Sequence, residues 1–158
     1  MSVLDRLKAQ RAADVKAVEH IPTLPLFIAS QEDKLPNDTI YIIRRALEYH
    51  PYIARRVWET KVSWNRDFKR AAGMFSPRQS LIELHPGLLQ TKDKRHLTET
   101  LLHELAHAMQ YYAYNKCDHK ETWREMMYLL GQKPERTHDI DECKDYEFVS
   151  RFDNLLKN

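Results

Sequence analysis

The stretch TETLLHELAHAMQYYAY, residues 98–114, decides the fold of this chain. Apolar residues recur in and just before it at the three- and four-residue spacing of an amphipathic helix: Leu97, Leu101, Leu105, Ala108 and Met109. The pattern predicts a long helix over residues 93–114. His103 and His107 are four residues apart, so they lie one turn apart on the same face of that helix. Both imidazoles can therefore reach a single metal ion.

Glu104, directly after the first histidine, is the candidate general base. Zinc binds imidazole nitrogen in tetrahedral sites, and a catalytic site keeps one position open for water. A carboxylate held beside that position can take the proton of the water and pass it to a leaving amine. His-Glu-x-x-His on a helix is thus typical of a metallopeptidase, and we expect one zinc ion per chain.

The third protein ligand has to come from outside this helix. His119 follows His107 by twelve residues, at the predicted start of the next helix. A reversal of the chain over residues 114–117 would return it to the other two histidines. We therefore predict a metal site of His103, His107 and His119.

Four other side chains compete for that third place. Glu121 and Glu125 are carboxylate candidates, although Glu121 stands three residues after Asp118 and can complete a capping box with it. The Cys117 thiolate is a further candidate. His138 lies farther along the chain and ranks last.

The segment before residue 60 reads as mainly helical. Residues 2–19 form an amphipathic pattern, and Pro22 with Pro25 predicts an extended link through residues 26–28. Asn37 or Asp38 can cap a second helix, and a short helix follows over residues 52–57. A last helix is predicted from Asp118 to Gly131, with its apolar face on Trp123, Met126, Met127 and Leu130.

The middle of the chain predicts strands instead. Residues 61–65 alternate between polar and apolar side chains, and residues 71–76 and 80–85 flank a turn that contains Pro77. Three short strands before a long helix are typical of an α+β domain rather than of repeated βαβ units.

The composition limits the class of protein and its setting. The 158 residues are 42% hydrophobic and 30% charged, which suits one globular domain. There are two cysteines and no CxxC pair, so neither a disulfide framework nor a four-cysteine zinc ribbon is expected. No apolar run reaches the roughly 20 residues that span a bilayer, and the charged N-terminus lacks the apolar core of a signal peptide. We expect a reducing, cytoplasmic or nucleoid-associated location and no membrane contact.

The basic residues are unevenly distributed although the formal net charge is only +2. The segment from Arg44 to Arg78 is rich in lysine and arginine, whereas residues 139–153 are acidic. A basic segment is a candidate surface for contact with DNA. Aromatic residues that could stack on bases or line a peptide groove are Trp64, Tyr111, Tyr112 and Tyr114, although burial in the core is the commoner use.

The motifs together resemble a known family. HELAHAMQ (103–110) followed by DHKETWREMMYLLG (118–131) resembles the SprT-like metallopeptidases, in which H-E-x-x-H is paired with a later histidine before an aromatic-containing helix. The upstream segment is similar as well: an asparagine, a small-residue-Gly strand and an Ile-x-Leu strand, here Asn65, Ala72-Gly73 and Ile82-Glu83-Leu84. The likeness covers about residues 37–134.

The resemblance implies a compact zincin-like α+β domain, with a small, mostly antiparallel three-stranded sheet packed on the active-site helix. It gives His103, His107 and His119 the ligand places and Glu104 the place of the base. We expect a single domain over residues 1–158, with a core at 37–134, an N-terminal helix at 2–19 and a polar tail at 135–158.

The resemblance also implies cleavage of proteins bound or crosslinked to DNA, as in the Spartan relatives. Many relatives carry a C-terminal zinc ribbon, whereas this chain has only Cys143 in that region. Contact with DNA would then come from the Arg44–Arg78 stretch or from a partner protein.

Two other functions fit the same motifs. One is a SprT-like binding module with a structural zinc, whose DNA affinity is carried by residues such as Arg55, Arg56 or Lys69 and depends on salt. The other is a zincin with a non-peptide substrate. The intact Glu104 favours the enzyme over the binding module, because a structural site does not need a base.

Overall fold

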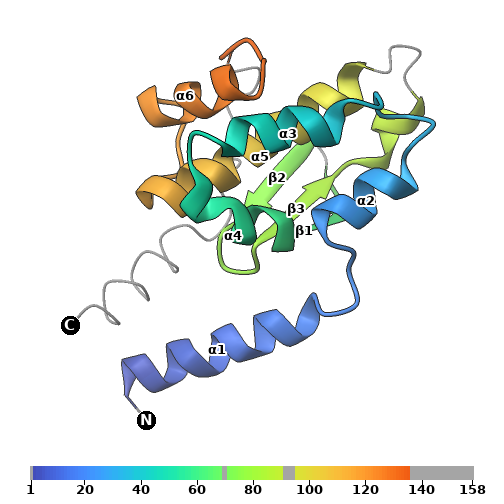
Figure 1. Cartoon of the computed structure of the whole chain (residues 1–158). Coiled ribbons are helices and arrows are strands. Elements are labelled where there is room, and N and C mark those ends of the chain that lie inside the picture. The colour runs from blue at the N-terminus through green and yellow to red at the C-terminus, as the bar shows by residue number, and fades with distance from the viewer. Residues whose placement is uncertain (1, 69–70, 91–94, 136–158) are drawn as a thin grey trace.

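A computed structural model describes residues 2–68, 71–90 and 95–135 of the chain. The helices are α1 (Val3–Ala17), α2 (Leu24–Ser30), α3 (Thr39–Leu47), α4 (Ala54–Glu59), α5 (Arg95–Tyr114) and α6 (Glu121–Leu129), with short 3-10 turns η1 (Pro51–Ile53) and η2 (Pro86–Gln90). The strands are β1 (Lys61–Trp64), β2 (Gly73–Ser76) and β3 (Leu81–Leu84). Helices and a small sheet pack together (Figure 1), so the predicted α+β class is confirmed.

The three strands lie in the order β1-β3-β2. β2 pairs antiparallel with β3, as the turn at Pro77 predicted, but β1 runs parallel to β3. The sheet is therefore mixed rather than mostly antiparallel, because the chain after β1 crosses to the far side of β3 before β2 begins. The register aligns Trp64 with Leu84 and Leu84 with Gly73, which places these three residues at one end of the sheet.

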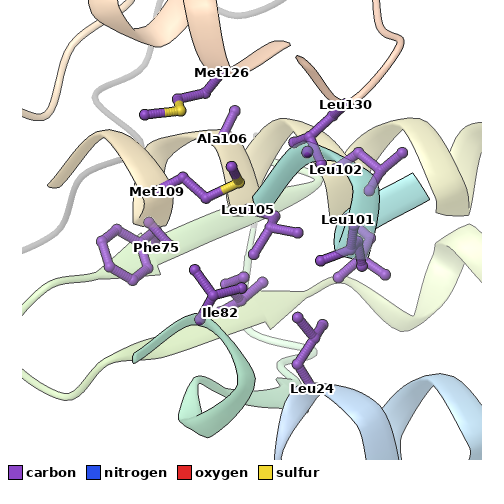
Figure 2. Packing of buried hydrophobic residues seen from close by; sticks show 14 of the residues in the cluster. Leu24, Phe75, Ile82, Leu101, Leu102, Leu105, Ala106, Met109, Met126 and Leu130 are labelled. Atoms are coloured by element: carbon purple, nitrogen blue, oxygen red, sulfur yellow. The ribbon is translucent and has the colours of Figure 1, made fainter. Parts of the chain in front are cut away.

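Helix α5 lies in the centre of the molecule. It packs on β2 and β3 with one side and on α6 with the other. Figure 2 shows Leu105 pointing from α5 toward Ile82 of the sheet, and Ala106 pointing toward Met126 of α6. Every residue from Leu101 to Tyr112 is buried, so this helix is enclosed on all sides. Each fully buried leucine contributes about 1.5–3 kcal/mol to stability relative to an exposed one.

Residues 24–30 form a helix, and the expected extended link is wrong there. Pro25 lies in the first turn, where a proline removes no intrahelical hydrogen bond. Leu24, Phe27 and Ile28 have the i, i+3, i+4 spacing of one helix face, and all three are buried against the core.

Helix α6 begins at Glu121, three residues later than predicted. The expected capping box does not form, because the Asp118 carboxylate accepts hydrogen bonds from the Lys120 N–H and from the Gln110 side chain instead. The predicted end is confirmed: Gly131 follows the helix with φ +70°, and its N–H donates to the Tyr128 carbonyl. Within the described ranges, no helix combines the length and the apolar character that crossing a bilayer requires.

Candidate metal centre

His103, His107 and His119 converge through their Nε2 atoms. The distance from His107 Nε2 to His119 Nε2 is 3.2 Å, and that from His119 Nε2 to His103 Nε2 is 3.4 Å. The three ligand atoms all lie within 4.8 Å of one another. Two imidazole ligands of a tetrahedral zinc ion are about 3.3 Å apart, because zinc–nitrogen bonds are about 2.0–2.1 Å long. The three histidines could thus hold a metal ion.

A single hydrogen between the three Nε2 atoms does not account for both of their close contacts. A neutral imidazole has one donor and one acceptor nitrogen. If His119 Nε2 carries a hydrogen, it can be directed at one neighbouring Nε2 only, so one hydrogen cannot serve both of these contacts. His103 is 7% exposed and His107 is fully buried, so water does not readily screen them. A cation bound by all three nitrogens removes the conflict, and an all-imidazole donor set suits zinc.

The loop between α5 and α6 carries His119 to the other two histidines. Asn115 follows α5 in the left-handed region, with φ 53°, and its N–H donates to the Tyr111 carbonyl. This residue ends the helix and reverses the chain, as the prediction over residues 114–117 requires. His119 lies in the loop two residues before α6, not in the first turn of that helix.

Gln110, which nothing in the sequence singled out as a site residue, anchors this loop. Its Nε2 donates to Asp118 Oδ1 at 2.7 Å and to Thr122 Oγ1 at 2.8 Å, and its Oε1 accepts from the Asp118 N–H at 3.1 Å. The side chain is fully buried. Burial by itself would raise the pKa of Asp118, but the hydrogen bonds from Gln110 and from the Lys120 N–H lower it overall. The available signal was position: Gln110 stands one turn after His107 on the same face.

Trp123 of α6 packs against all three rings. Its ring is stacked on His107 at 5.6 Å between centroids and 25° between planes. It also meets His103 at 5.0 Å and His119 at 4.8 Å, edge to face. Trp123 is fully buried, as the core assignment predicted. It therefore fixes the orientation of the histidines in addition to filling the core.

Glu104 lies against the sheet. It is 1% exposed and follows His103 on α5. A Cβ added to Gly73 of β2 would stand 3.0 Å from Glu104 Cγ and 3.0 Å from Thr100 Cγ2. The absence of a side chain at residue 73 is what lets β2 approach the helix at this carboxylate.

The other candidates for the third ligand either interact with other residues or lie elsewhere in the chain. Glu125 Oε1 lies 3.0 Å from His50 Nε2, and Glu125 Oε2 accepts a 2.7 Å hydrogen bond from the Tyr114 hydroxyl. Cys117 is disulfide-bonded, contrary to the expectation of reduced cysteines, and so offers no thiolate. Glu121 is exposed at the start of α6. His138 lies outside the described residues.

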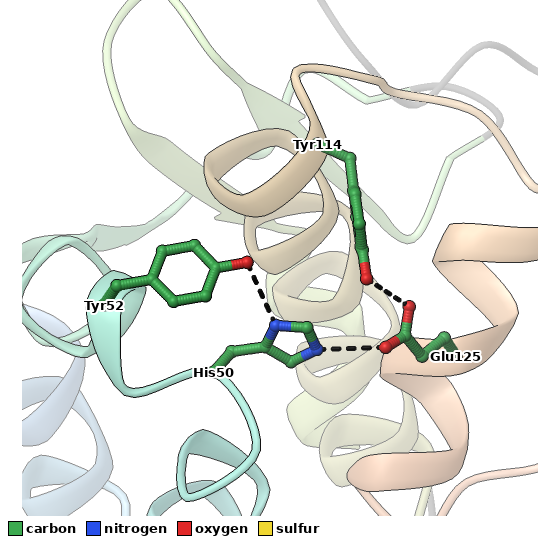
Figure 3. A network of polar contacts seen from close by, with 4 residues as sticks. All are labelled: His50, Tyr52, Tyr114 and Glu125. Atoms are coloured by element: carbon green, nitrogen blue, oxygen red, sulfur yellow. Dashed lines mark hydrogen bonds and ion pairs between the residues drawn. The ribbon is translucent and has the colours of Figure 1, made fainter.

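The Glu125 contacts form a polar network that joins three elements. Figure 3 shows His50, before η1, between Tyr52 and Glu125, with Tyr114 at the end of α5. His50 Nδ1 is 3.2 Å from the Tyr52 hydroxyl. The hydrogen bond to Glu125 raises the pKa of Tyr114 to about 12. The network thus ties the η1 region to the end of α5 and to α6.

The basic stretch is largely on the surface. Arg44, Arg45, Arg55 and Arg66 are exposed, and Arg55 forms an exposed ion pair with Glu59. Lys69 and Arg70 lie outside the described residues. Of the aromatic candidates, Tyr111 and Tyr112 are buried, whereas Tyr114 is 37% exposed. Contact with DNA through this stretch stays a prediction.

Comparison with known proteins places the chain in a family. The model of the SprT-like family matches residues 47–143, which is more than half of the chain and includes the three histidines and Glu104. Searches of the curated proteins and of the solved structures found no match. On the family match, and with its three histidines in ligand geometry, this chain belongs to the SprT-like family.

Proposed function

We propose that this protein is a zinc-dependent metallopeptidase, with His103, His107 and His119 as the metal ligands and Glu104 as the general base. The observation that carries the proposal is the meeting of three histidine Nε2 atoms, two of them from buried residues, with His119 Nε2 at the separation of tetrahedral zinc ligands from each of the other two. Membership of the SprT-like family supports it.

The catalytic roles follow from where these side chains stand. A zinc ion in this site supplies Lewis-acid activation of a peptide carbonyl and of a water molecule. Glu104 takes one proton from the attacking water, whose oxygen forms the new bond to the carbonyl carbon. Glu104 then gives that proton to the departing amine as the C–N bond breaks. Gly73 supports this role by letting β2 hold the stem of Glu104 in place.

We further propose that the substrates are proteins bound or crosslinked to DNA. Family membership and the exposed arginines at Arg44, Arg45 and Arg55 support this choice. Arginine and lysine contacts to phosphates would bring the enzyme to such substrates, with an affinity that falls as salt rises.

The test combines metal content with activity. We expect about one zinc per chain in the wild type, little or none in His103→Ala and His119→Ala, and wild-type zinc in Glu104→Gln. Cleavage of an unfolded protein substrate, with and without single-stranded DNA, should be lost in all three variants. Tyr128→Phe, an exposed change on α6, is the matched control and should keep both zinc and activity.

Two outcomes would overturn parts of the proposal. Wild-type zinc in His119→Ala would remove His119 from the ligand set. Stoichiometric zinc without cleavage of any protein, with DNA present, would favour the binding module with a structural zinc.

A further inference from the structure

A second site lies between α1 and the rest of the chain, at the end of the sheet away from the histidines. The cavity there has a volume of about 590 Å³. Its walls come from α1 through Arg11, Val15 and Lys16, and from the core through Arg56, Lys61 and Arg78. Lys61 is aligned with Leu81, whereas the metal site adjoins the opposite end of the strands, where Gly73 meets Glu104. In Figure 1, α1 lies to one side of the other helices and the sheet.

A partly buried ion pair holds α1 in this position. Arg78 Nε is 2.8 Å from Asp14 Oδ2, and the Asp14 side chain is only 6% exposed. Arg11 Nη1 donates a 2.8 Å hydrogen bond to the Arg78 carbonyl. Because both contacts join α1 to the turn between β2 and β3, the two walls of the cavity are tied together.

The cavity carries an excess of positive charge. Arg11, Lys16, Arg56 and Lys61 form no ion pair with an acidic side chain of the described residues. Two acids also line the cavity, but one of them, Glu59, is paired with Arg55 at 2.9 Å. Four cations thus face a single unpaired carboxylate, that of Glu19, which favours an anionic ligand.

One of the cationic groups is held in place, and apolar side chains line part of the α1 side of the cavity. The Arg56 guanidinium lies 4.2 Å from the centre of the Tyr112 ring, whose hydroxyl is 2.8 Å from Thr60 Oγ1. A guanidinium held over an aromatic ring loses less freedom on binding a ligand than a mobile one. Ala12, Val15 and Val18 add apolar surface beside the charges.

We propose that this cleft, between α1 and the Lys61 end of the sheet, binds the phosphate group of a nucleotide, either free or within a nucleic-acid strand. Arginine and lysine side chains that line one cavity suit phosphate oxygens, and the apolar side chains among them suit a sugar or a base. The volume falls within the range of about 300–1,000 Å³ that small ligands occupy. Helix α1 lies outside residues 47–143, so half of this cleft is not part of the family match.

The test compares two pairs of lysine substitutions. The cleft variant Lys16→Gln/Lys61→Gln removes one cation from each wall and keeps the Asp14–Arg78 ion pair. The control Lys34→Gln/Lys133→Gln removes the same charge from exposed positions outside the cavity. Binding of a fluorescent oligothymidylate is followed by anisotropy at several salt concentrations, with unlabelled mononucleotide, inorganic phosphate and polyglutamate as competitors.

We expect the cleft variant to bind the oligonucleotide about tenfold more weakly at low salt and the control less than twofold more weakly. Each lost phosphate contact lowers the slope of log affinity against log salt by about 0.7, so the cleft variant should lose about 1.4. Competition by mononucleotide and phosphate would identify a single-nucleotide site, and competition by unlabelled oligonucleotide alone would identify a strand site. Either result supports the proposal.

Three results would overturn it. The first is an equal loss of oligonucleotide affinity in the cleft variant and the control. The second is displacement of the fluorescent oligonucleotide by polyglutamate as effectively as by unlabelled oligonucleotide of equal charge. The third is that no phosphate-bearing probe binds. Zinc content and peptidase activity on a DNA-free substrate should be the same in both variants, because neither touches the metal site. Failure of this proposal is therefore distinguishable from failure of the peptidase assignment.

Discussion

Gly73 and Glu104 are in such close contact that any side chain at residue 73 would press on the carboxylate stem. A Cβ there would stand 3.0 Å from Glu104 Cγ, and Leu84 Cδ2 on the neighbouring strand would be 3.3 Å away. The edge strand and the central helix are thus joined at the residue that we propose as the general base. The glycine has a packing role here, because no left-handed backbone angle is involved.

We predict that Gly73→Ala lowers peptidase activity at least tenfold while zinc affinity stays within about twofold of the wild type. The added methyl group must displace Glu104 or the backbone of β2, and overpacking of this kind costs about 1–3 kcal/mol of stability. Thermal unfolding, chelator competition and cleavage rates measure the three effects. The double variant Gly73→Ala/Thr100→Ser removes the second contact atom, Thr100 Cγ2, and should recover part of the activity. Unchanged activity in Gly73→Ala would show that β2 does not position Glu104.

Trp123 should determine how tightly zinc is held. We expect Trp123→Leu to weaken zinc binding about tenfold or more, in line with the loss of groups that orient metal ligands. Trp123→Phe keeps an aromatic ring against His107 and should lose much less. Met126→Leu is a volume-conserving control on the same helix, also fully buried. Equal zinc affinity in the leucine and phenylalanine variants would mean that the ring contacts do not orient the ligands.

Gln110 should matter for the metal although it does not contact it. Gln110→Leu keeps the size of the side chain but removes its hydrogen bonds to Asp118 and Thr122. We expect a loss of about 1 kcal/mol in the free energy of unfolding, because the partly buried Asp118 and Thr122 side chains lose these hydrogen bonds. The loop should then hold His119 less firmly, which a chelator titration would register as weaker zinc binding. The pKa of Asp118 should rise, and NMR titration can follow it.

The Tyr114–Glu125 hydrogen bond predicts a change in stability at high pH. The pKa of Tyr114 is raised from 10.0 to about 12 in the folded chain. The folded state therefore keeps a proton that the unfolded chain loses, so this contribution is complete below pH 10 and is lost as the pH rises through about 12. Unfolding curves of the wild type and of Tyr114→Phe between pH 9 and 12 should converge as the pH rises. Ultraviolet titration of Glu125→Gln should show one tyrosine with a lowered pKa.

Zinc should stabilise the fold in proportion to its concentration. A ligand that binds only the folded state adds about 2.7 kcal/mol at one hundred times its dissociation constant. We expect the melting temperature of the wild type to rise with added zinc and to fall after treatment with a chelator. His107→Ala should not respond to zinc, because a fully buried ligand is missing. A zinc-dependent shift in that variant would indicate a metal site elsewhere.

The local pattern of apolar and polar residues was sufficient to predict which elements near the site are helices and which are strands. The helical spacing around Leu101 and Leu105 predicted α5, and the alternation at residues 61–65 predicted β1. The glycine at residue 131 predicted the end of α6. These features depend on residues only a few positions apart in the chain, so their spacing can be recognised in the sequence itself.

Other features could not be derived in the same way. Residues 24–30 are helical because Leu24 and Phe27 bury against the core, which outweighs the two prolines nearby. The parallel pairing of β1 with β3 depends on the path of the chain after β1, which side-chain alternation does not encode. The later start of α6 depends on Gln110, which competes for the Asp118 carboxylate from another helix.

The sequence by itself determined the α+β class and the helix that bears His103, Glu104 and His107. It also determined the choice of His119 as the third candidate ligand. These conclusions were possible because spacing along a helix and the order of motifs depend on residues that are close in the chain. Only the tertiary structure decided how these groups are held. It brought the three Nε2 atoms together, set Trp123 behind them, placed Gly73 against Glu104 and closed the basic cleft with the Asp14–Arg78 pair. Such contacts join residues far apart in the chain, and they form only when burial of the whole core offsets the loss of chain entropy.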